Sequence, residues 1–136
     1  MERRKAQVAT LNESNPTIVG ASVSAPGTPV SKVCTVYSPT ELRVDILVTA
    51  ATNASTTAAF VLQQSPGPDH TGNVAIWTDI KSVSVPPTAS DEYVTILVLQ
   101  ENSGDDPFLP LAESVRVVAR TGAGDSIVVK RVNVLS

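Results

Sequence analysis

The sequence predicts an all-β protein, a single β-sandwich or jelly-roll domain of about eight strands with an extended N-terminal arm. Three observations predict this class. Aromatic residues make up only 4% of the chain, so aliphatic residues supply most of the hydrophobic 42%, and the β-branched ones among them favour strands. Apolar and polar residues alternate in several segments, which are separated by loops rich in Pro, Gly, Asn and Asp. No long segment repeats its apolar residues with a helical period.

The beginning of the chain differs from the remainder. Residues 1–32 are rich in Ser, Thr, Asn, Pro and Gly and carry only short apolar pieces. Such a composition favours an extended arm with one or two edge strands, lying either on its own barrel or on a neighbouring chain. We therefore expect an arm at residues 1–32 and a β-sandwich domain at residues 33–136, which is a usual length for one domain.

The clearest strand is expected at residues 41–50, where one face carries Leu42, Val44, Ile46 and Val48 and the other carries Glu41, Arg43, Asp45 and Thr49. The remaining strands are expected at 57–64, 75–80, 82–85, 92–100, 114–120 and 126–135. We expect two hairpins. One has the Pro/Gly/Asp loop at 66–73, and the other has a glycine-containing loop at 121–125.

Residues 92–100 are apolar on both faces of the expected strand. Val94, Ile96 and Val98 share one face, and Tyr93, Leu97 and Leu99 lie on the other. A strand of this kind must be covered on both sides, whereas the outer face of a two-layer sandwich normally meets water. A loop, the arm or another subunit would supply the cover, and we favour association of subunits.

The charges exclude some partners and suggest a contact surface. With 10 basic and 13 acidic residues the net charge is −3, which argues against a nucleic-acid binder. No window is apolar enough for a membrane span. Arg116 and Arg120 share a strand face, and the expected second hairpin would bring Lys130 or Arg131 close to Arg116. This basic face is either solvated or matched to an acidic neighbouring surface. The expected interface residues are Arg3, Arg4, Val94, Ile96, Val98, Arg116 and Arg120.

Reacting groups are scarce. His70 is the only histidine and Cys34 the only cysteine, so a typical zinc shell cannot form. The chain lacks a Gly-x-Ser-x-Gly elbow, and its acidic loop at 101–107 lacks the spacing of an EF-hand. We expect Cys34 to be a small buried hydrophobe. The sequence therefore predicts no catalytic residue, no metal site and no cofactor, and the protein is not expected to be an enzyme.

Two segments carry a family resemblance. Residues 60–65 (FVLQQS), followed after a Gly/Asp loop by 76–80 (IWTDI), resemble a strand–loop–strand pattern of small tailed-bacteriophage virion proteins. Residues 115–119 (VRVVA), with the glycine-containing turn and the valine-rich last strand, fit the same pattern. The whole chain most resembles a capsid decoration (cement) protein.

The resemblance implies a structural role in the bacteriophage virion. A decoration protein of this kind is made in the host cytoplasm, forms a homo-oligomer, most often a homotrimer, and braces the major capsid protein. It implies no residue-level functional site. The alternative is a carbohydrate-binding or adhesin β-sandwich module, such as a phage tail or fibre component. In that case Trp77 and Tyr93 would be ligand platforms, and the loop at 65–73 would form the rim.

Overall fold

The computed structural model describes residues 6–10, 17–19, 27–35, 41–52, 58–65, 77–99, 114–122 and 124–135. These parts of the chain contain strands and no helix, which confirms the predicted all-β class. Accordingly, no helix able to cross a membrane is found among them. The strands are β1 (Ala6–Val8), β2 (Thr17–Val19), β3 (Thr28–Pro29), β4 (Cys34–Thr35), β5 (Glu41–Thr52), β6 (Ala59–Ser65), β7 (Thr78–Ser84), β8 (Glu92–Leu99), β9 (Ser114–Arg120) and β10 (Ser126–Leu135).

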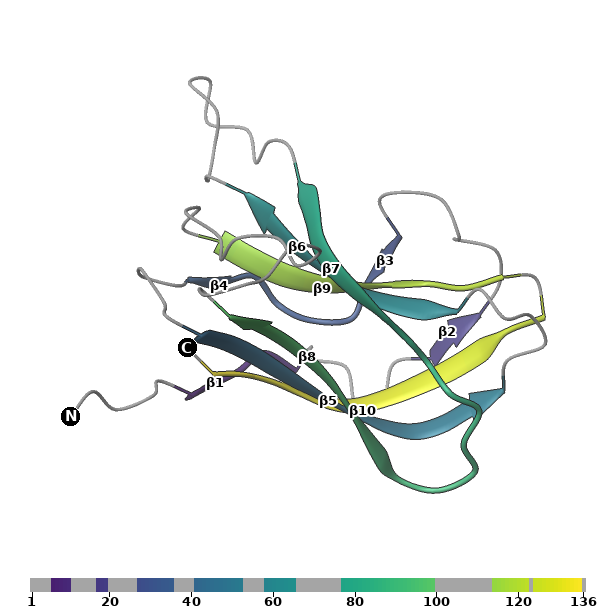
Figure 1. Ribbon diagram of the computed structural model, residues 1–136. Coiled ribbons are helices and arrows are strands. Elements are labelled where there is room, and N and C mark those ends of the chain that lie inside the picture. Colours follow the sequence, from purple (N-terminus) through teal and green to yellow (C-terminus); the bar gives the residue numbers. More distant parts are fainter. Residues whose placement is uncertain are drawn as a thin grey trace.

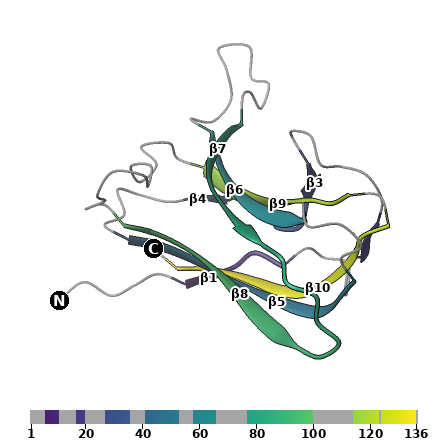
Figure 2. The ribbon, with the colours of Figure 1, turned by 45° about the vertical axis from the view of Figure 1, so that its right-hand side comes forward.

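The strands form two antiparallel sheets that face each other (Figure 1). In sheet 1 the order is β1-β10-β5-β8, and β2 pairs with β10 beyond the end of β1. In sheet 2 the order is β3-β9-β6-β7, and β4 pairs with β9 in the same way as β2 pairs with β10. The turned view shows the two layers with the core between them (Figure 2).

The order of pairing is that of a jelly roll. β6 pairs with β7, β5 with β8, β3 and β4 with β9, and β1 and β2 with β10. The chain is therefore one long antiparallel ribbon whose bend is the β6–β7 hairpin. When this ribbon is wound up, strand pairs that follow one another along it lie in opposite sheets. The pairing of β10 with β5 completes sheet 1, and the pairing of β9 with β6 completes sheet 2. The first predicted hairpin is confirmed.

The second predicted hairpin is wrong, because β9 and β10 lie in different sheets. Their connection is a tight turn in which Asp125 Oδ2 accepts the Gly122 N–H at 2.6 Å and the Gly122 carbonyl accepts the Asp125 N–H at 3.1 Å. Gly124 has a φ of 87°, which is a conformation that glycine adopts without strain. The same turn residues serve hairpins and sheet-to-sheet crossings, so the local pattern did not distinguish them. The predicted separate strand at 82–85 is likewise part of β7.

The core lies between the inward faces of the sheets. The predicted inward row of β5 is confirmed, because Leu42, Val44, Ile46 and Val48 are fully buried. Phe60 is the largest fully buried side chain, so branched aliphatic residues fill most of the remaining volume. Contact between such side chains supplies the main stabilisation, at roughly 25 cal/mol for each Å² of apolar surface removed from water.

The described parts of residues 6–35 belong to this sandwich. They supply edge strands to both sheets, and Ala9 and Val30 are each only 1% exposed in the shared core. Two hydroxyl groups complete the ladders where these edge strands are interrupted. Thr10 Oγ1 accepts the Val132 N–H, and Ser31 Oγ accepts the Val117 N–H. A β-bridge between Thr10 and Ser31 joins the two sheets at this edge, so this part of the expected arm lies on its own chain.

Candidate functional site

A row of polar side chains crosses the outer face of sheet 2. Gln63 of β6 is the register partner of Asp79 on β7 and of Arg116 on β9. An irregularity between Leu62 and Gln63 in the β6–β7 pairing places Gln63 opposite Asp79, with Ile80 as the extra residue of β7. The bulge thus brings a carboxylate from the edge strand next to an amide from the central strand.

Hydrogen bonds connect the whole row. Gln63 Nε2 donates to Asp79 Oδ1 at 2.9 Å, and Arg116 Nε donates to Gln63 Oε1 at 2.9 Å. Arg120 binds Asp79 with both terminal nitrogens, Nη1 to Oδ2 at 2.7 Å and Nη2 to Oδ1 at 2.9 Å. The Arg116 guanidinium lies 4.3 Å from the centroid of the Trp77 ring, which is within cation–π range.

The electrostatics of the row follow from these contacts. The hydrogen bond from Arg120 holds the pKa of the Asp79 carboxyl below its usual value, with Gln63 contributing in the same direction and burial opposing it. Burial lowers the pKa of Arg116, although a guanidinium stays protonated in a protein. Each charge in the row already has a partner within the chain.

The row has no arrangement suited to catalysis. It contains no nucleophile beside a base, and the described residues include no group of three or more His, Cys, Asp or Glu that could hold a metal ion. Cys34 is buried as predicted. Burial raises the pKa of its thiol, which the nearby Lys32 partly offsets, and such a cysteine is unreactive. His70 and the loop at 101–107 lie outside the described residues.

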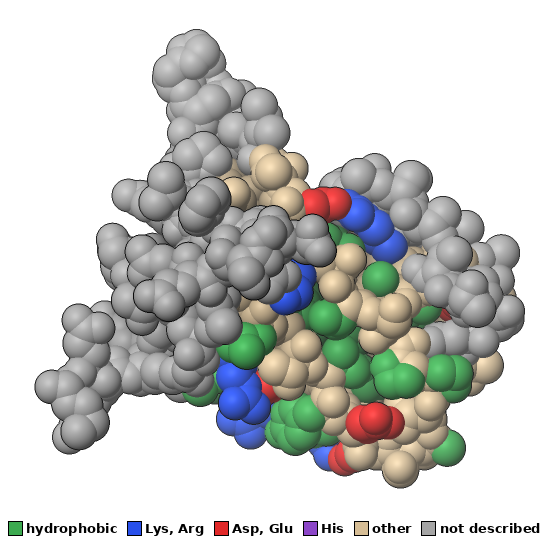
Figure 3. Space-filling view, viewed as in Figure 1, with side chains coloured by type: hydrophobic (Ala, Val, Ile, Leu, Met, Phe, Trp, Pro, Cys, Tyr) green, Lys and Arg blue, Asp and Glu red, His purple; other side chains and the backbone are tan. Residues whose placement is uncertain are grey.

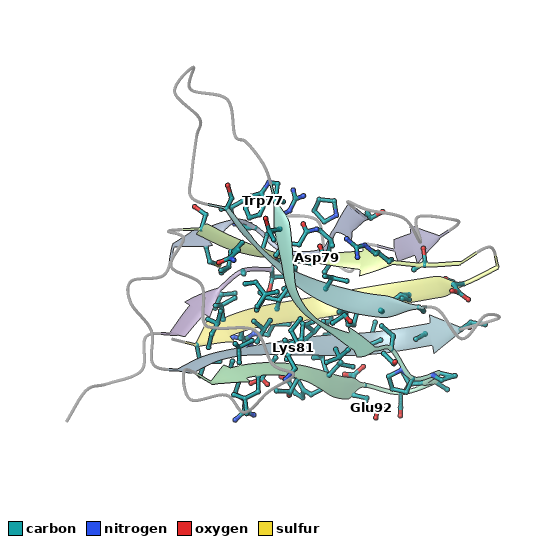
Figure 4. The ribbon with its side chains drawn as sticks, turned by 45° about the horizontal axis from the view of Figure 1, so that its top comes forward. Trp77, Asp79, Lys81 and Glu92 are labelled. Carbon is teal, nitrogen blue, oxygen red and sulfur yellow. The ribbon has the colours of Figure 1, made fainter. Side chains whose placement is uncertain are left out.

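The two aromatic platform candidates do not form one site. Trp77 immediately precedes β7 in sheet 2, and Arg116 covers one of its ring faces. Tyr93 belongs to β8 in sheet 1, next to Glu92. Figure 4 shows Trp77 at the upper side of the drawn strands and Glu92 at the lower side. A single saccharide could therefore not stack on both Trp77 and Tyr93.

The predicted interface residues of β8 lie on the inward face of the strand. Ile96 and Val98 are 0% exposed and belong to the chain's own core, against which the partly buried Val94 packs. They are therefore unavailable to another chain. The outward side chains of β8 include Tyr93, which is 56% exposed, and Leu97, which is 38% exposed. Both faces of this strand are apolar in sequence, so alternation alone could not say which of them was inward.

The basic residues that were predicted to share one face lie in two different sheets. Arg116 and Arg120 share the outer face of sheet 2 as expected, but they bind Gln63 and Asp79 of the same chain. Lys130 lies in the other sheet and pairs with Asp91 at 3.7 Å, so it does not join the Arg116 face. Arg3 and Arg4 lie outside the described residues.

Sequence reasoning missed Gln63, Asp79 and Lys81. Lys81 Nζ donates to the Leu97 carbonyl at 3.0 Å, which links the edge strands β7 and β8 across the opening between the sheets. Figure 4 shows Trp77, Asp79 and Lys81 following one another along β7. The available signal was the interruption of an apolar strand by two glutamines, since a buried amide requires a hydrogen-bond partner.

Comparison with known proteins adds no identification. No protein-family model matches the chain, and no curated protein matches it either. The function must therefore be inferred from the fold and from the described surfaces.

The Asp79 contacts predict a pH dependence. The pKa of Asp79 is lower in the folded state than in the unfolded state. Its carboxylate therefore adds to the free energy of unfolding above the unfolded pKa of about 3.9. This contribution is lost as the pH falls through the pKa of the folded state. The Asp79 side chain is 47% exposed, so we expect Asp79→Asn to cost less than about 1 kcal/mol at pH 7, and progressively less as the pH is lowered below about 3.9. Urea unfolding over a series of pH values measures this. In an Arg120→Ala background the same substitution should have a smaller effect at pH 7, and an equal effect would contradict the assignment.

Proposed function

We propose that the chain is a non-enzymatic structural protein of a tailed-bacteriophage virion that decorates and stabilises the capsid. In this proposal it is made in the host cytoplasm and resides in the virion. Its partners are further copies of itself, in the trimer that the sequence resemblance implies, and the major capsid protein.

One observation carries the proposal. The charged side chains of the outer polar row are paired within the chain, whereas Tyr93 and Leu97 are exposed on an edge strand. Figure 3 shows hydrophobic side chains reaching the visible surface between sparse charged ones. Such a surface is suited to burial against protein. The fold is compatible with this role, because jelly rolls occur in viral capsid proteins and also in lectins.

The mechanism is adhesive. Apolar contacts between chains contribute roughly 25 cal/mol for each Å² buried, less the costs of association. An oligomer that touches the capsid through several copies converts weak single contacts into firm attachment through avidity.

The test is addition of the purified protein to undecorated capsids assembled from the major capsid protein of the bacteriophage that encodes it. We expect the protein to co-sediment with these capsids and to raise their thermal stability. An Arg3→Glu/Arg4→Glu variant is expected to bind less, because both positions belong to the predicted contact segment. Arg131→Glu, on the exposed outer face of β10, is the matched control. Deletion of residues 1–20 is a poorer test, since it removes β1, β2 and the buried Ala9.

Failure of the unaltered protein to bind these capsids would contradict the proposal. Glycan binding that Trp77→Ala abolishes would contradict it too, and would favour the carbohydrate-binding module.

A further inference from the structure

The sandwich has four edges, and three of them carry features that prevent pairing with another chain. An open edge strand offers unpaired N–H and carbonyl groups, and proteins protect such edges with short strands, charges or bulges. The edge strands β1 to β4 are only two or three residues long. β7 carries Asp79 and Lys81 and contains the bulge in its pairing with β6.

β8 is the least protected of the four edges, and Glu92 at its beginning is its only charged residue. It is eight residues long and pairs with β5 without any register shift. From Tyr93 to Leu99 it contains no charged residue. Among the described residues, no strand pairs with its other side.

The backbone groups that point away from β5 belong to alternate residues of β8. The Leu97 carbonyl accepts a hydrogen bond from Lys81 of the opposite sheet, so it points outward. Ala51, an inward residue of β5, exchanges both backbone hydrogen bonds with Thr88 on the β8 side. In β5, the residues whose side chains point into the core therefore direct their backbone hydrogen bonds toward β8. Their register partners in β8, such as Ile96, direct their own backbone hydrogen bonds back toward β5. The N–H and carbonyl groups that point away from β5, and are open to another strand, are consequently those of Tyr93, Thr95 and Leu97.

We propose that β8 pairs antiparallel with β8 of a second copy of this chain, about a two-fold axis at Thr95. This register places Thr95 opposite Thr95 and Tyr93 opposite Leu97 of the second copy. The backbone groups of all three positions point away from β5, so the N–H and carbonyl groups of the two strands face each other at paired residues. The Leu97 carbonyl, already bound by Lys81, keeps a second lone pair for the Tyr93 N–H of the other copy.

Side chains and charges agree with the same register. The pairing brings the exposed Tyr93 of each copy beside the exposed Leu97 of the other, and an aromatic–aliphatic cross-strand pair is favourable. The exposed Glu92 lies at one end of the edge and Lys81 at the other. In the antiparallel two-fold arrangement Glu92 lies opposite Val98 of the second copy. The neighbouring residue of that copy is Leu97, whose carbonyl binds Lys81. Two acid–base pairs therefore face each other across the contact.

The contact goes beyond the proposed function. One edge used by both partners can produce only a two-fold dimer, so a trimer would form through another surface. It is tested on the purified chain without capsids, and its failure leaves the capsid proposal standing.

The first test is sedimentation velocity over a concentration series. The unaltered protein is expected to show a monomer–dimer equilibrium. Thr95→Pro removes an outward N–H that β5 does not use, and proline is tolerated at such edge positions. We expect it to weaken dimerisation at least about tenfold, because the two-fold axis doubles each lost hydrogen bond. Thr95→Val retains the N–H and should still dimerise, although both variants lose the hydroxyl that donates to Asp45.

The second test does not depend on folding of the proline variant. Thr95→Cys should form an intermolecular disulfide rapidly under mild oxidation, because the Cα atoms of a hydrogen-bonded antiparallel pair lie about 5.5 Å apart. Arg131→Cys, on the same outer face but away from the edge, should crosslink slowly, and the buried Cys34 should not compete. Glu92→Lys should weaken the dimer, and Glu92→Gln should weaken it less. An unaltered protein that stays monomeric at millimolar concentration, or equal crosslinking rates for the two cysteine variants, would overturn the inference.

Discussion

Ile96→Ala is expected to lower the free energy of unfolding by about 2–5 kcal/mol, whereas Leu97→Ala should cost less than about 1 kcal/mol. The two residues are neighbours on β8 with side chains of equal size. Ile96 is 0% exposed in the core, and Leu97 is 38% exposed. Removing the Ile96 side chain leaves a cavity between the sheets, whereas water already reaches Leu97.

Urea unfolding of both variants measures this difference directly. The protein should be dilute, so that self-association through β8 does not contribute to stability. The ratio of the two losses tests which face of β8 is inward. Equal losses, or a larger loss for Leu97→Ala, would show that this face is assigned incorrectly.

Gly27→Ala is expected to lower the free energy of unfolding by about 2–4 kcal/mol. Gly27 has a φ of 90°, where a residue with a side chain is strained. A Cβ at this position would also lie 2.9 Å from the Ala119 carbonyl oxygen and 3.2 Å from Val118 Cγ2. Both neighbours belong to β9, and a backbone oxygen in a sheet cannot move aside without breaking its ladder.

Thermal or urea unfolding gives the magnitude, and the nearby Val33→Ala serves as control because Val33 is 55% exposed. We expect the control to change stability by less than about 0.5 kcal/mol. A Gly27→Ala variant as stable as the unaltered protein would mean that the segment before β3 does not approach β9 as closely as described.

Most strands could be predicted because their signal is local. The ranges predicted for β9 and β10 match the observed ones, and the alternation of β5 identified its inward row correctly. Each of these strands shows its pattern within its own residues, since a half-buried strand needs one apolar face. The β6–β7 hairpin was predictable for the same reason, because its two strands are close in sequence.

The candidate site was much less predictable. Arg116 and Arg120 were placed on one face correctly, but their partners Gln63 and Asp79 come from two other strands. Only the pairing of β6 with both β7 and β9, together with the bulge beside Gln63, brings these side chains together. Two arginines that were predicted as interface residues therefore have partners within their own chain.

The sequence by itself determined the all-β class, most of the strands and the scarcity of reacting groups, because these follow from composition and local periodicity. The tertiary structure alone decided the jelly-roll pairing, the crossing of β9 to β10, the inward face of β8 and the partners of the two arginines. The physical reason is that these features depend on contacts between strands far apart in the chain. An apolar side chain such as Ile96 or Leu97 satisfies the local pattern equally well on either face, and only the opposite sheet determines which one is buried.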